Sequence, residues 1–481
     1  MKRCYALLAA ILLLTACTVG PDYVRRPTVD APVAFKEAGD WKIGEPRDQE
    51  IKGQWWEIFN DQLLDSLEQQ VSISNQNLAQ VEAKFRQARA LVQSTRAGLF
   101  PFVSVGAAAS RSATSSSGGN QSSLAANSSR GANNNYSLSL GATWEPDVWG
   151  RIRRQLESSE ASAAASAADI EAMRLSIQAE LAQNYFQLRA LDAQKQLFDD
   201  TATAYEKSLQ LTQNQYAVGV VARADVVQAE TQLLATRAQA IDIAVQRAQL
   251  EHAIALLTGT PASTFSVRQA ALAATPPAVP FGVPAALLER RPDISAAERR
   301  VAAANAQIGV ARAAYFPNIT LSATGALQSS TLSQWLSLPS RFWSVGPAIA
   351  ATLFDAGLRR AQTDFAIAAY DANAAFYRQT VLTGFKEVED NLAALSILEE
   401  EAAVQSQALQ SARQSVVLVT NQYKAGLVSY LNVATVQATA LNSERAAVDI
   451  LNRRLNATVL LIRALGGGWN ASGGSPVAVH E

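Results

Sequence analysis

The sequence predicts a mainly helical protein made of two tandem copies of one unit, each with long coiled-coil helices and two β-strands. Three observations predict this fold class. Landmark residues recur at one constant offset along the chain. Two very long segments almost completely lack Gly and Pro, the residues that interrupt helices. Four short segments alternate apolar with small polar residues, as strands with one apolar face do.

The two copies are identified by glycines at corresponding positions. Gly219 and Gly259 of the first copy recur as Gly426 and Gly466 of the second, at the same offset. The boundaries expected from this duplication are, in chain order, a signal peptide at 1–16, an extended lipid-anchored segment at 17–60, a first repeat at 61–259, a Pro-rich connector at 260–291, a second repeat at 292–466 and a flexible tail at 467–481.

The N-terminus predicts export and lipidation. A short basic start and an apolar run precede the tetrapeptide LTAC, which ends at Cys17 and resembles a bacterial lipobox. Such a signal implies that Cys17 becomes the first residue and carries a diacylglyceryl group and an N-acyl chain such as palmitate. Thr18 follows in place of the Asp that resembles an inner-membrane retention signal, which favours the outer membrane. An ordinary secretory signal that happens to end near a cysteine is the alternative.

The sequence of each copy predicts a hairpin of two helices. The first helix is long, because residues 151–218 contain no Gly or Pro and residues 358–425 contain a single Gly. Apolar residues in both segments keep the spacing of a coiled-coil seam. A shorter helix follows in each copy, with Asp225 or Asn432 expected as its N-cap and a Gly just past its end.

A further helix is predicted before the strands of each copy. It spans about residues 61–97 in the first copy and about residues 292–314 in the second. In the second copy, Ser295 and Glu298 have the spacing of a capping box, in which an N-cap Ser is followed three residues later by Glu.

Four candidate strands lie between the helices. Each has one apolar face and one small polar face, which is typical of membrane β-strands. A water-soluble antiparallel sheet with one wet face is the alternative. Because four strands are too few to close a membrane barrel and open sheet edges are not tolerated in lipid, membrane strands here require an oligomer. The candidate strands are residues 103–106, 136–144, 319–324 and 343–353.

The composition disfavours an enzyme. The chain has two His and two Cys, one of which, Cys4, lies in the predicted signal peptide, so material for a metal site or a His-dependent catalytic triad is nearly absent. The formal net charge of -1 gives no electrostatic support for nucleic-acid binding. We therefore expect no catalytic residues, no metal, no nucleic-acid partner, and no cofactor other than the lipid on Cys17.

Four motifs lie at 17–23, 290–294, 303–309 and 353–357. Together they resemble the TolC-like outer membrane efflux proteins, and in particular their NodT-type lipoprotein branch. This resemblance implies a homotrimer with a twelve-stranded β-barrel, four strands from each protomer, on a long periplasmic α-helical barrel. It also implies partners, namely a periplasmic membrane-fusion adaptor and an inner-membrane pump, and passive export of drugs or other toxic small molecules through the outer membrane.

The resemblance also places the closing point of the channel at the ends of the helical hairpins. The acidic gate positions of the family correspond to Asn432 and Thr435 here, a departure that removes the basis for a strong anionic ring from the second copy. Asp225 of the first copy is acidic and acts as an N-cap, as a gate residue or as both. Tyr423 is either a residue of the coiled-coil seam or a hydrogen-bond donor to Asp225.

Two alternative functions stay open at the level of sequence. A type I protein-secretion duct would use the same architecture with a transport ATPase as its partner. A periplasmic coiled-coil lipoprotein without a pore would keep the helices and the lipid but would have no membrane strands.

Overall fold

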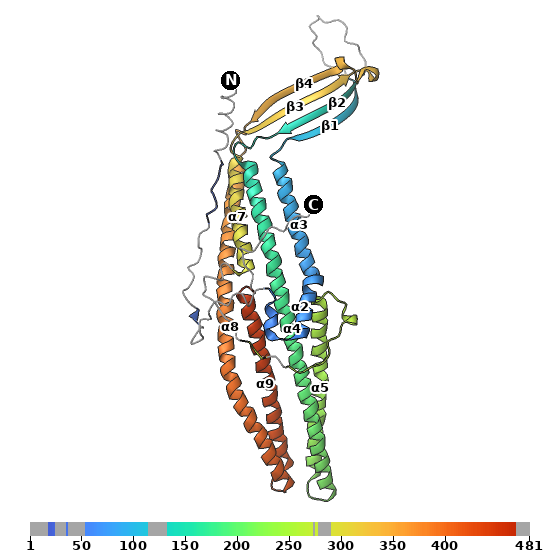
Figure 1. Cartoon of the computed structure of the whole chain (residues 1–481), viewed down its shortest axis with the longest axis vertical. Helices are drawn as coiled ribbons and strands as arrows, with labels where there is room; N and C mark the ends of the chain where they lie inside the picture. The colour runs from blue at the N-terminus through green and yellow to red at the C-terminus, as the bar shows by residue number, and fades with distance from the viewer. Residues whose placement is uncertain are drawn as a thin grey trace. The chain divides into compact units, whose positions relative to one another are not determined.

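The computed structural model describes residues 18–24, 35–36, 53–113, 132–272, 275–277 and 290–467 (Figure 1). The predicted signal peptide, Cys17, nearly all of the tail and residues 273–274 and 278–289 of the connector lie outside the described residues. The chain divides into two compact units. Unit 1 contains residues 1–26, 86–165 and 298–375, and unit 2 contains residues 27–85, 166–297 and 376–481.

Unit 1 contains a four-stranded antiparallel sheet in the order β1-β2-β3-β4. All four predicted strands are present, and each begins before its predicted segment. The last strand ends at Ala350, three residues before the predicted end. Among the described residues, β1 and β4 each pair with one neighbour only, so both outer edges of the sheet are open there. The strands are β1 (Phe102–Ser112), β2 (Asn133–Trp144), β3 (Asn318–Ser329) and β4 (Arg341–Ala350).

The helices confirm the duplication. After α2, the chain runs twice through the same series of elements. Each series consists of a helix, two strands, a long helix and a shorter helix. The two long helices, α4 and α8, have 67 residues each, and the shorter helices that follow them have 35 each. Figure 1 shows each shorter helix running back beside its long helix. The helices are α2 (Gln62–Ser74), α3 (Gln76–Ala97), α4 (Arg151–Ala217), α5 (Arg223–Leu257), α7 (Pro292–Ala313), α8 (Leu358–Lys424) and α9 (Tyr430–Ala464).

The helix predicted at 61–97 is divided at Asn75. This residue is extended (φ -69°, ψ 123°), and its side-chain oxygen accepts a hydrogen bond from the backbone N–H of Leu78 at 3.1 Å, which caps the start of α3. Its side-chain amide donates to the carbonyl of Leu257 at 2.7 Å. An Asn side chain can bond to backbone groups in place of the hydrogen bonds of a helix. Asn75 does so here, and it therefore ends α2 and starts α3.

Three predictions of helix caps are wrong. α5 begins at Arg223 and α9 at Tyr430, so Asp225 and Asn432 lie inside the first turn instead of capping it. The glycine turns after the long helices reverse the chain within a few residues. As a result, α5 and α9 begin before the positions that N-cap preferences favour. Ser295 is not an N-cap either, because α7 already begins at Pro292, a favoured first helical residue.

Both repeats end in the same way. Gly259 and Gly466 have positive φ values of 69° and 93° just past α5 and α9, as predicted. A Cβ atom on Gly259 would lie 2.4 Å from the carbonyl oxygen of Ser74, and one on Gly466 would lie 2.5 Å from that of Arg290. Only glycine fits where the end of each repeat contacts the chain just before α3 or α7.

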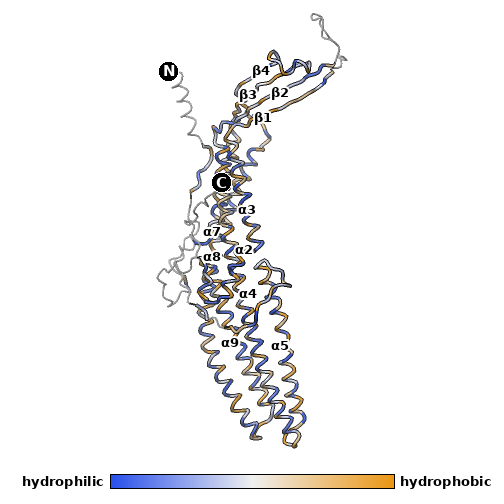
Figure 2. Tube along the Cα trace, turned by 45° about the vertical axis from the view of Figure 1, so that its right-hand side comes forward, coloured by the Kyte–Doolittle hydropathy of each residue, from blue (hydrophilic) through white to orange (hydrophobic). Residues whose placement is uncertain are grey.

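The largest apolar core lies in unit 2. It contains the aromatic side chains of Trp55, Tyr185 and Phe186 together with residues from α2, α4, α5, α8 and α9. Along the helices, hydrophobic and hydrophilic residues alternate on a short scale, so that each helix has apolar and polar faces (Figure 2). No helix within the described residues is long and apolar enough to cross a bilayer.

Candidate functional site at the ends of the helical hairpins

The two hairpins turn with the same geometry. In the first, the backbone N–H of Gly219 donates to the carbonyl of Tyr216 and that of Val220 to Gln215, both at 2.9 Å. These are the two hydrogen bonds of a Schellman motif, in which the glycine takes a positive φ, here 75°. The second hairpin repeats both bonds around Gly426, whose φ is 74°. The repeated sequence therefore builds the same end twice.

An aromatic cluster near these turns brings the two hairpins together. The rings of Tyr423 on α8 and Tyr430 on α9 meet edge to face, with centroids 5.7 Å apart. Ala229 of α5 and Val433 of α9 are buried in the same cluster. Both tyrosines are almost fully buried, so the cluster is an apolar contact between the first and the second hairpin.

Neutral hydrogen bonds link the hairpins beside this cluster. The Tyr423 hydroxyl lies 3.1 Å from that of Thr212 on α4. The Tyr430 hydroxyl donates to Oε1 of Gln232 on α5 at 3.3 Å. Gln437 on α9 donates to Ser208 on α4, also at 3.3 Å. These bonds connect both helices of the first hairpin to both helices of the second, and none of the side chains involved carries a charge at neutral pH.

Burial keeps the two tyrosine hydroxyls protonated. It is the main cause that raises the pKa of Tyr430, to about 12, and nearby Tyr205 and Tyr423 add to the effect. Burial also raises the pKa of Tyr423, with a further upward contribution from the charge of Asp225 and an opposing one from the hydrogen bond with Thr212. Both hydroxyls therefore remain neutral hydrogen-bonding groups throughout the physiological pH range.

The structure separates the predicted gate residues. Tyr423 takes part in the link between the hairpins, but its partner is Thr212; no hydrogen bond joins it to Asp225 in the described part of the chain. Asp225 is half-buried in the first turn of α5. Asn432 and Thr435 are exposed on α9, where the Thr435 hydroxyl donates to the carbonyl of Leu431 at 2.8 Å.

Thr435 lines an open groove between α5 and α9. The groove has a volume of about 740 Å³, and most of its lining side chains are small or uncharged, including Gln228, Thr231 and Thr439. Arg445 is the charged residue of this lining. The sequence did not single out the glutamines that link the hairpins, because a Gln on a helix is common and only the fold shows that it bridges two hairpins.

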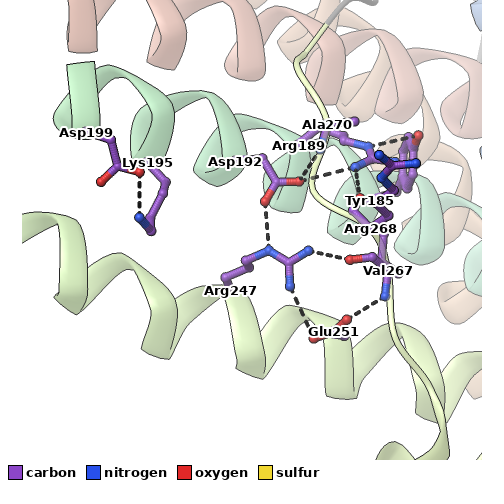
Figure 3. A network of polar contacts seen from close by, with 10 residues as sticks. All are labelled: Tyr185, Arg189, Asp192, Lys195, Asp199, Arg247, Glu251, Val267, Arg268 and Ala270. Carbon is purple, nitrogen blue, oxygen red and sulfur yellow. Dashed lines mark hydrogen bonds and ion pairs between the residues drawn. The ribbon is translucent and has the colours of Figure 1, made fainter.

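A second polar network fixes the start of the connector to the first hairpin (Figure 3). Asp192 on α4 accepts from Arg247 on α5 at 2.7 Å and from Arg189 on α4 at 3.2 Å. The two arginines donate onward to backbone carbonyls, Arg247 to Val267 at 2.5 Å and Arg189 to Arg268 at 2.8 Å. The buried charges are therefore paired with one another and with backbone groups.

Two further contacts complete this clamp on the connector. Glu251 of α5 accepts from the backbone N–H of Val267 at 2.5 Å, and Asp192 accepts from that of Ala270 at 3.2 Å. Side chains from about one turn of α4 and one turn of α5 thus hold a segment that has no regular structure. Sequence reasoning missed the clamp, because its members lie far apart along the chain and are ordinary helix-surface residues in the sequence.

The chain matches a known family over both repeats. The profile of the family described as "Outer membrane efflux protein" matches residues 67–260 and 283–467. The chain belongs to the outer membrane efflux protein family. Its two matched segments coincide with the two copies that the helices and strands display.

Relatives of this efflux protein act at the outer membrane. It is 31% identical to the "Toluene efflux pump outer membrane protein TtgF" of Pseudomonas putida over 100% of both chains. It is also 31% identical to the "Pyoverdine export outer membrane protein OpmQ" of Pseudomonas aeruginosa, over 97% of each chain. The protein is thus an outer membrane efflux channel of the same kind, located in the outer membrane.

Solved structures show the same architecture. The outer-membrane channel OprN is 33% identical, with a TM-score of 0.84 over 94% of this chain and 100% of that one. The outer membrane protein VceC from Vibrio cholerae is 26% identical, with a TM-score of 0.79 over 86% of this chain and 98% of that one. The predicted fold class, mainly helical with two repeats and antiparallel strands, is therefore confirmed.

In unit 1 of the efflux protein, hydrogen bonds and an ion pair hold the residues that follow Cys17. The backbone N–H of Val19 donates to the carbonyl of Trp149 at 3.2 Å. The buried guanidinium of Arg154 donates to the Asp22 carboxylate at 2.6 Å. Asn305 on α7 donates to the carbonyl of Pro21 at 2.9 Å. Two distant parts of the sequence, around 149–154 and at Asn305, thus hold residues 19–22 in place.

Glycines allow this close approach. Gly20 has a φ of 109°, and a Cβ atom there would lie 2.5 Å from Cα of Gly309 on α7. A Cβ on Gly309 itself would lie 2.9 Å from Cγ of Arg154 and 3.1 Å from the carbonyl oxygen of Val19. Two of the motifs that carried the family resemblance, at 17–23 and 303–309, are therefore parts of one contact.

Proposed function

We propose that this outer membrane efflux protein is the passive exit duct of a tripartite pump. In this proposal it works with a periplasmic membrane-fusion adaptor and an inner-membrane pump, and it carries drugs or other toxic small molecules to the exterior without making or breaking a bond. The relatives support this, because those described above are named for toluene efflux and pyoverdine export. A type I protein-secretion duct has weaker support, since neither relative is named for a secreted protein.

We further propose that the duct is a homotrimer whose sheets complete a twelve-stranded barrel. The supporting observation is the sheet of unit 1, in which β1 and β4 each lack a partner on one side. Side chains on these two strands, among them Val105, Trp343 and Ile349, are exposed apolar groups. Lipid tolerates exposed apolar side chains but not open sheet edges, so pairing of β1 with β4 of another protomer satisfies both conditions. A periplasmic lipoprotein without a pore would leave these strands unexplained.

The lipid anchor is a separate proposal. Cys17 lies two residues before Val19, whose backbone N–H is bonded to Trp149, so we propose that a diacylglyceryl and N-acyl lipid on its sulfur and amine starts close to this end of unit 1. The Trp149 ring stacks on Phe316 with centroids 4.8 Å apart, and Trp side chains are enriched at the level of the lipid headgroups. The lipid then adds membrane affinity to that of the strands.

We propose that the hairpin ends form the periplasmic gate. The bonds from Tyr423 and Tyr430 to the first hairpin hold the ends together, and Asp225 contributes the nearby negative charge. Asn432 and Thr435 are uncharged, so the second copy adds no acidic ring and no strong cation preference. Opening requires the hairpins of each protomer, or the protomers themselves, to separate.

Drug sensitivity in a cell that keeps its pump and adaptor tests the function. Deleting the gene is expected to raise sensitivity to pump substrates, and the intact gene is expected to restore resistance. The same deletion in a strain that lacks the inner-membrane pump should change little, because a passive duct has no energy source of its own. Equal sensitivity with and without the protein in the pump-bearing strain would contradict the proposal.

A further inference from the structure

Two apolar stripes are exposed on the helical hairpins of a single chain. Val227, Leu234 and Ile241 form one stripe on α5, and each of them is at least half exposed. Ile397 and Val404 belong to the other stripe, on α8, and both are 63% exposed. Residues within each stripe are seven positions apart, which is the spacing of a coiled-coil seam.

The duplication relates both stripes to surfaces that are already packed inside the chain. At the offset that converts Gly219 into Gly426, Leu234 of α5 corresponds to Leu441 of α9. Leu234 is 54% exposed, whereas Leu441 is 8% exposed. Leu441 lies in a cluster with residues of the first hairpin. The second hairpin therefore inserts Leu441 into the first. The corresponding Leu234 of the first hairpin stays exposed, with no receiving surface among the described residues of the same chain.

The receiving surface is duplicated as well. Leu441 packs with Phe198, Ala240 and Ile243 of the first hairpin. Their counterparts in the second hairpin are Gln405, Ala447 and Ile450, and all three line a cavity of about 150 Å³ between α8 and α9. Gln405 occupies the position that Phe198 occupies in the first copy. The cavity of the second hairpin therefore lies where the first hairpin has the aromatic ring of Phe198.

We propose that Leu234 of one protomer inserts into the cavity formed by Gln405, Ala447 and Ile450 of the next protomer. The occupant is a second copy of this chain, and the inference rests on the proposed homotrimer, for which it names the contact in the helical region. Each protomer then offers one leucine and one cavity. Such a head-to-tail contact is heterologous and forms a ring when its rotation closes.

The observations favour a second copy over a foreign helix. The contact inside the chain already joins the counterparts of both surfaces, and the contact between chains repeats it with the same residue positions. The α8 stripe supports this, since Val404 corresponds to Leu197, which packs against the Leu441 cluster in the chain. A foreign partner would match these positions only by coincidence.

Cysteine pairs test the contact in the full-length protein in membranes. Cys17 is the only native cysteine after the predicted signal peptide, and its sulfur is blocked in the lipidated form proposed above. Leu234→Cys with Ala447→Cys is expected to give a cross-linked trimer on a non-reducing gel. The control pair Leu441→Cys with Ala240→Cys joins the corresponding positions inside one chain, so it is expected to give only an internally linked monomer. A second control, Leu234→Cys with Lys386→Cys, pairs Leu234 with an exposed residue outside the cavity and is expected to give no trimer.

The proposal is overturned if the control pair inside the chain forms its disulfide while the Leu234/Ala447 pair remains monomeric. Purified protein that conducts ions and exports drugs but fails this cross-link would keep the duct and reject the contact. Cross-linked trimers that carry no current would keep the contact and reject the duct. The two proposals therefore fail separately.

A compensating pair of substitutions tests the fit of the leucine. Gln405→Phe restores the ring against which Leu441 packs in the first copy, so it is expected to increase the amount of trimer that survives mild detergent. Adding Leu234→Ala removes the leucine that contacts the new ring and is expected to cancel this gain. If Gln405→Phe leaves the trimer unchanged or weakens it, or if the gain persists with Leu234→Ala, the cavity does not receive Leu234.

Discussion

The hydroxyl of Tyr423 on α8 lies 3.1 Å from the hydroxyl of Thr212 on α4. Thr212 is fully buried, and Tyr423 is nearly so, so water does not replace this bond when it is lost. The bond joins the end of the second hairpin to the first. It involves no charge, in contrast to the ion pair that an acidic gate residue would suggest.

Removing the Tyr423 hydroxyl is expected to loosen the gate. Tyr423→Phe keeps the ring and its contact with Tyr430 but leaves the Thr212 hydroxyl without this partner, which costs about 1 kcal/mol or slightly more. We expect more frequent opening in single-channel recordings. Tyr216→Phe is the matched control, because Tyr216 occupies the corresponding position of the first copy and is 46% exposed. Identical recordings for the two variants would remove Tyr423 from the gate.

Breaking the clamp on the connector is expected to destabilise the protein strongly. Asp192→Asn keeps the shape of the side chain but removes the charge that pairs with Arg189 and Arg247, which leaves buried positive charge uncompensated. Such changes cost about 3–5 kcal/mol. Thermal unfolding in detergent, followed by circular dichroism, measures the effect.

Asp199→Asn is the control for this measurement. Asp199 pairs with Lys195 on the same helix, and its side chain is 49% exposed (Figure 3). Exposed pairs of this kind contribute about 0–1 kcal/mol. A loss of stability in Asp192→Asn no larger than that in Asp199→Asn would show that the clamp contributes little.

We predict an unusual dependence of stability on pH from the buried carboxyl group of Glu68. It is fully buried on α2, and neither of its carboxylate oxygens has a hydrogen-bond partner among the described residues. Burial raises its pKa well above the ordinary value of 4.5, and the charge of Asp65 adds to this. Above pH 4.5 the unfolded chain releases the proton while the folded chain retains it, so stability falls as the pH rises, by about 1.4 kcal/mol for each pH unit between the two pKa values.

Glu68→Gln is therefore expected to stabilise the protein at neutral pH. The gain should shrink as the pH is lowered and should disappear below the unfolded pKa, where Glu68 is protonated in both states. Melting temperatures at a series of pH values measure this difference. Glu400→Gln, at an exposed position on α8, is the control and should show no such trend. A gain for Glu68→Gln that is the same at every pH would contradict the account of a raised pKa.

A methyl group on Gly309 is expected to release the N-terminal segment. In Gly309→Ala the new Cβ collides with Arg154 and with the carbonyl of Val19, which forces residues 19–22 out of their place. We expect faster proteolysis near the N-terminus in intact outer membranes. Gly384→Ala, in the middle of α8, is the control, because its Cβ meets the nearest atom, Nε of Arg291, at 3.4 Å. Equal protection of both variants would show that the contact with α7 does not hold the segment.

Local sequence patterns predicted the fold well where one residue type determines the backbone. The alternation in β2 and the glycines at 219, 259, 426 and 466 each depend on a short stretch of chain. The break at Asn75 was missed, because the partner that holds it, Leu257, lies in a distant helix. The cap at Asp225 was placed too late, because the preceding glycine turn determines where α5 begins.

The site was less predictable than the fold. Tyr423 was identified from its position in the repeat, but Thr212 and Gln232 are polar residues on helices that have many equivalents in the sequence. Their role depends on which two hairpins face each other, and that is a property of the packed structure. The same holds for Asp192 and Arg247, which are distant in sequence and become a buried pair only after α4 and α5 fold back on one another.

Single-channel recording of the purified protein in planar lipid bilayers tests the central claim most directly. The protein is expected to insert as a trimer and to give discrete, long-lived conductance steps without any added energy source, and Tyr423→Phe should open more often than the unmodified protein. Sheet edges that close between protomers account for such a pore. A homogeneous, correctly folded preparation that inserts into the bilayer and passes no current would contradict the assignment of this chain as an outer membrane exit duct.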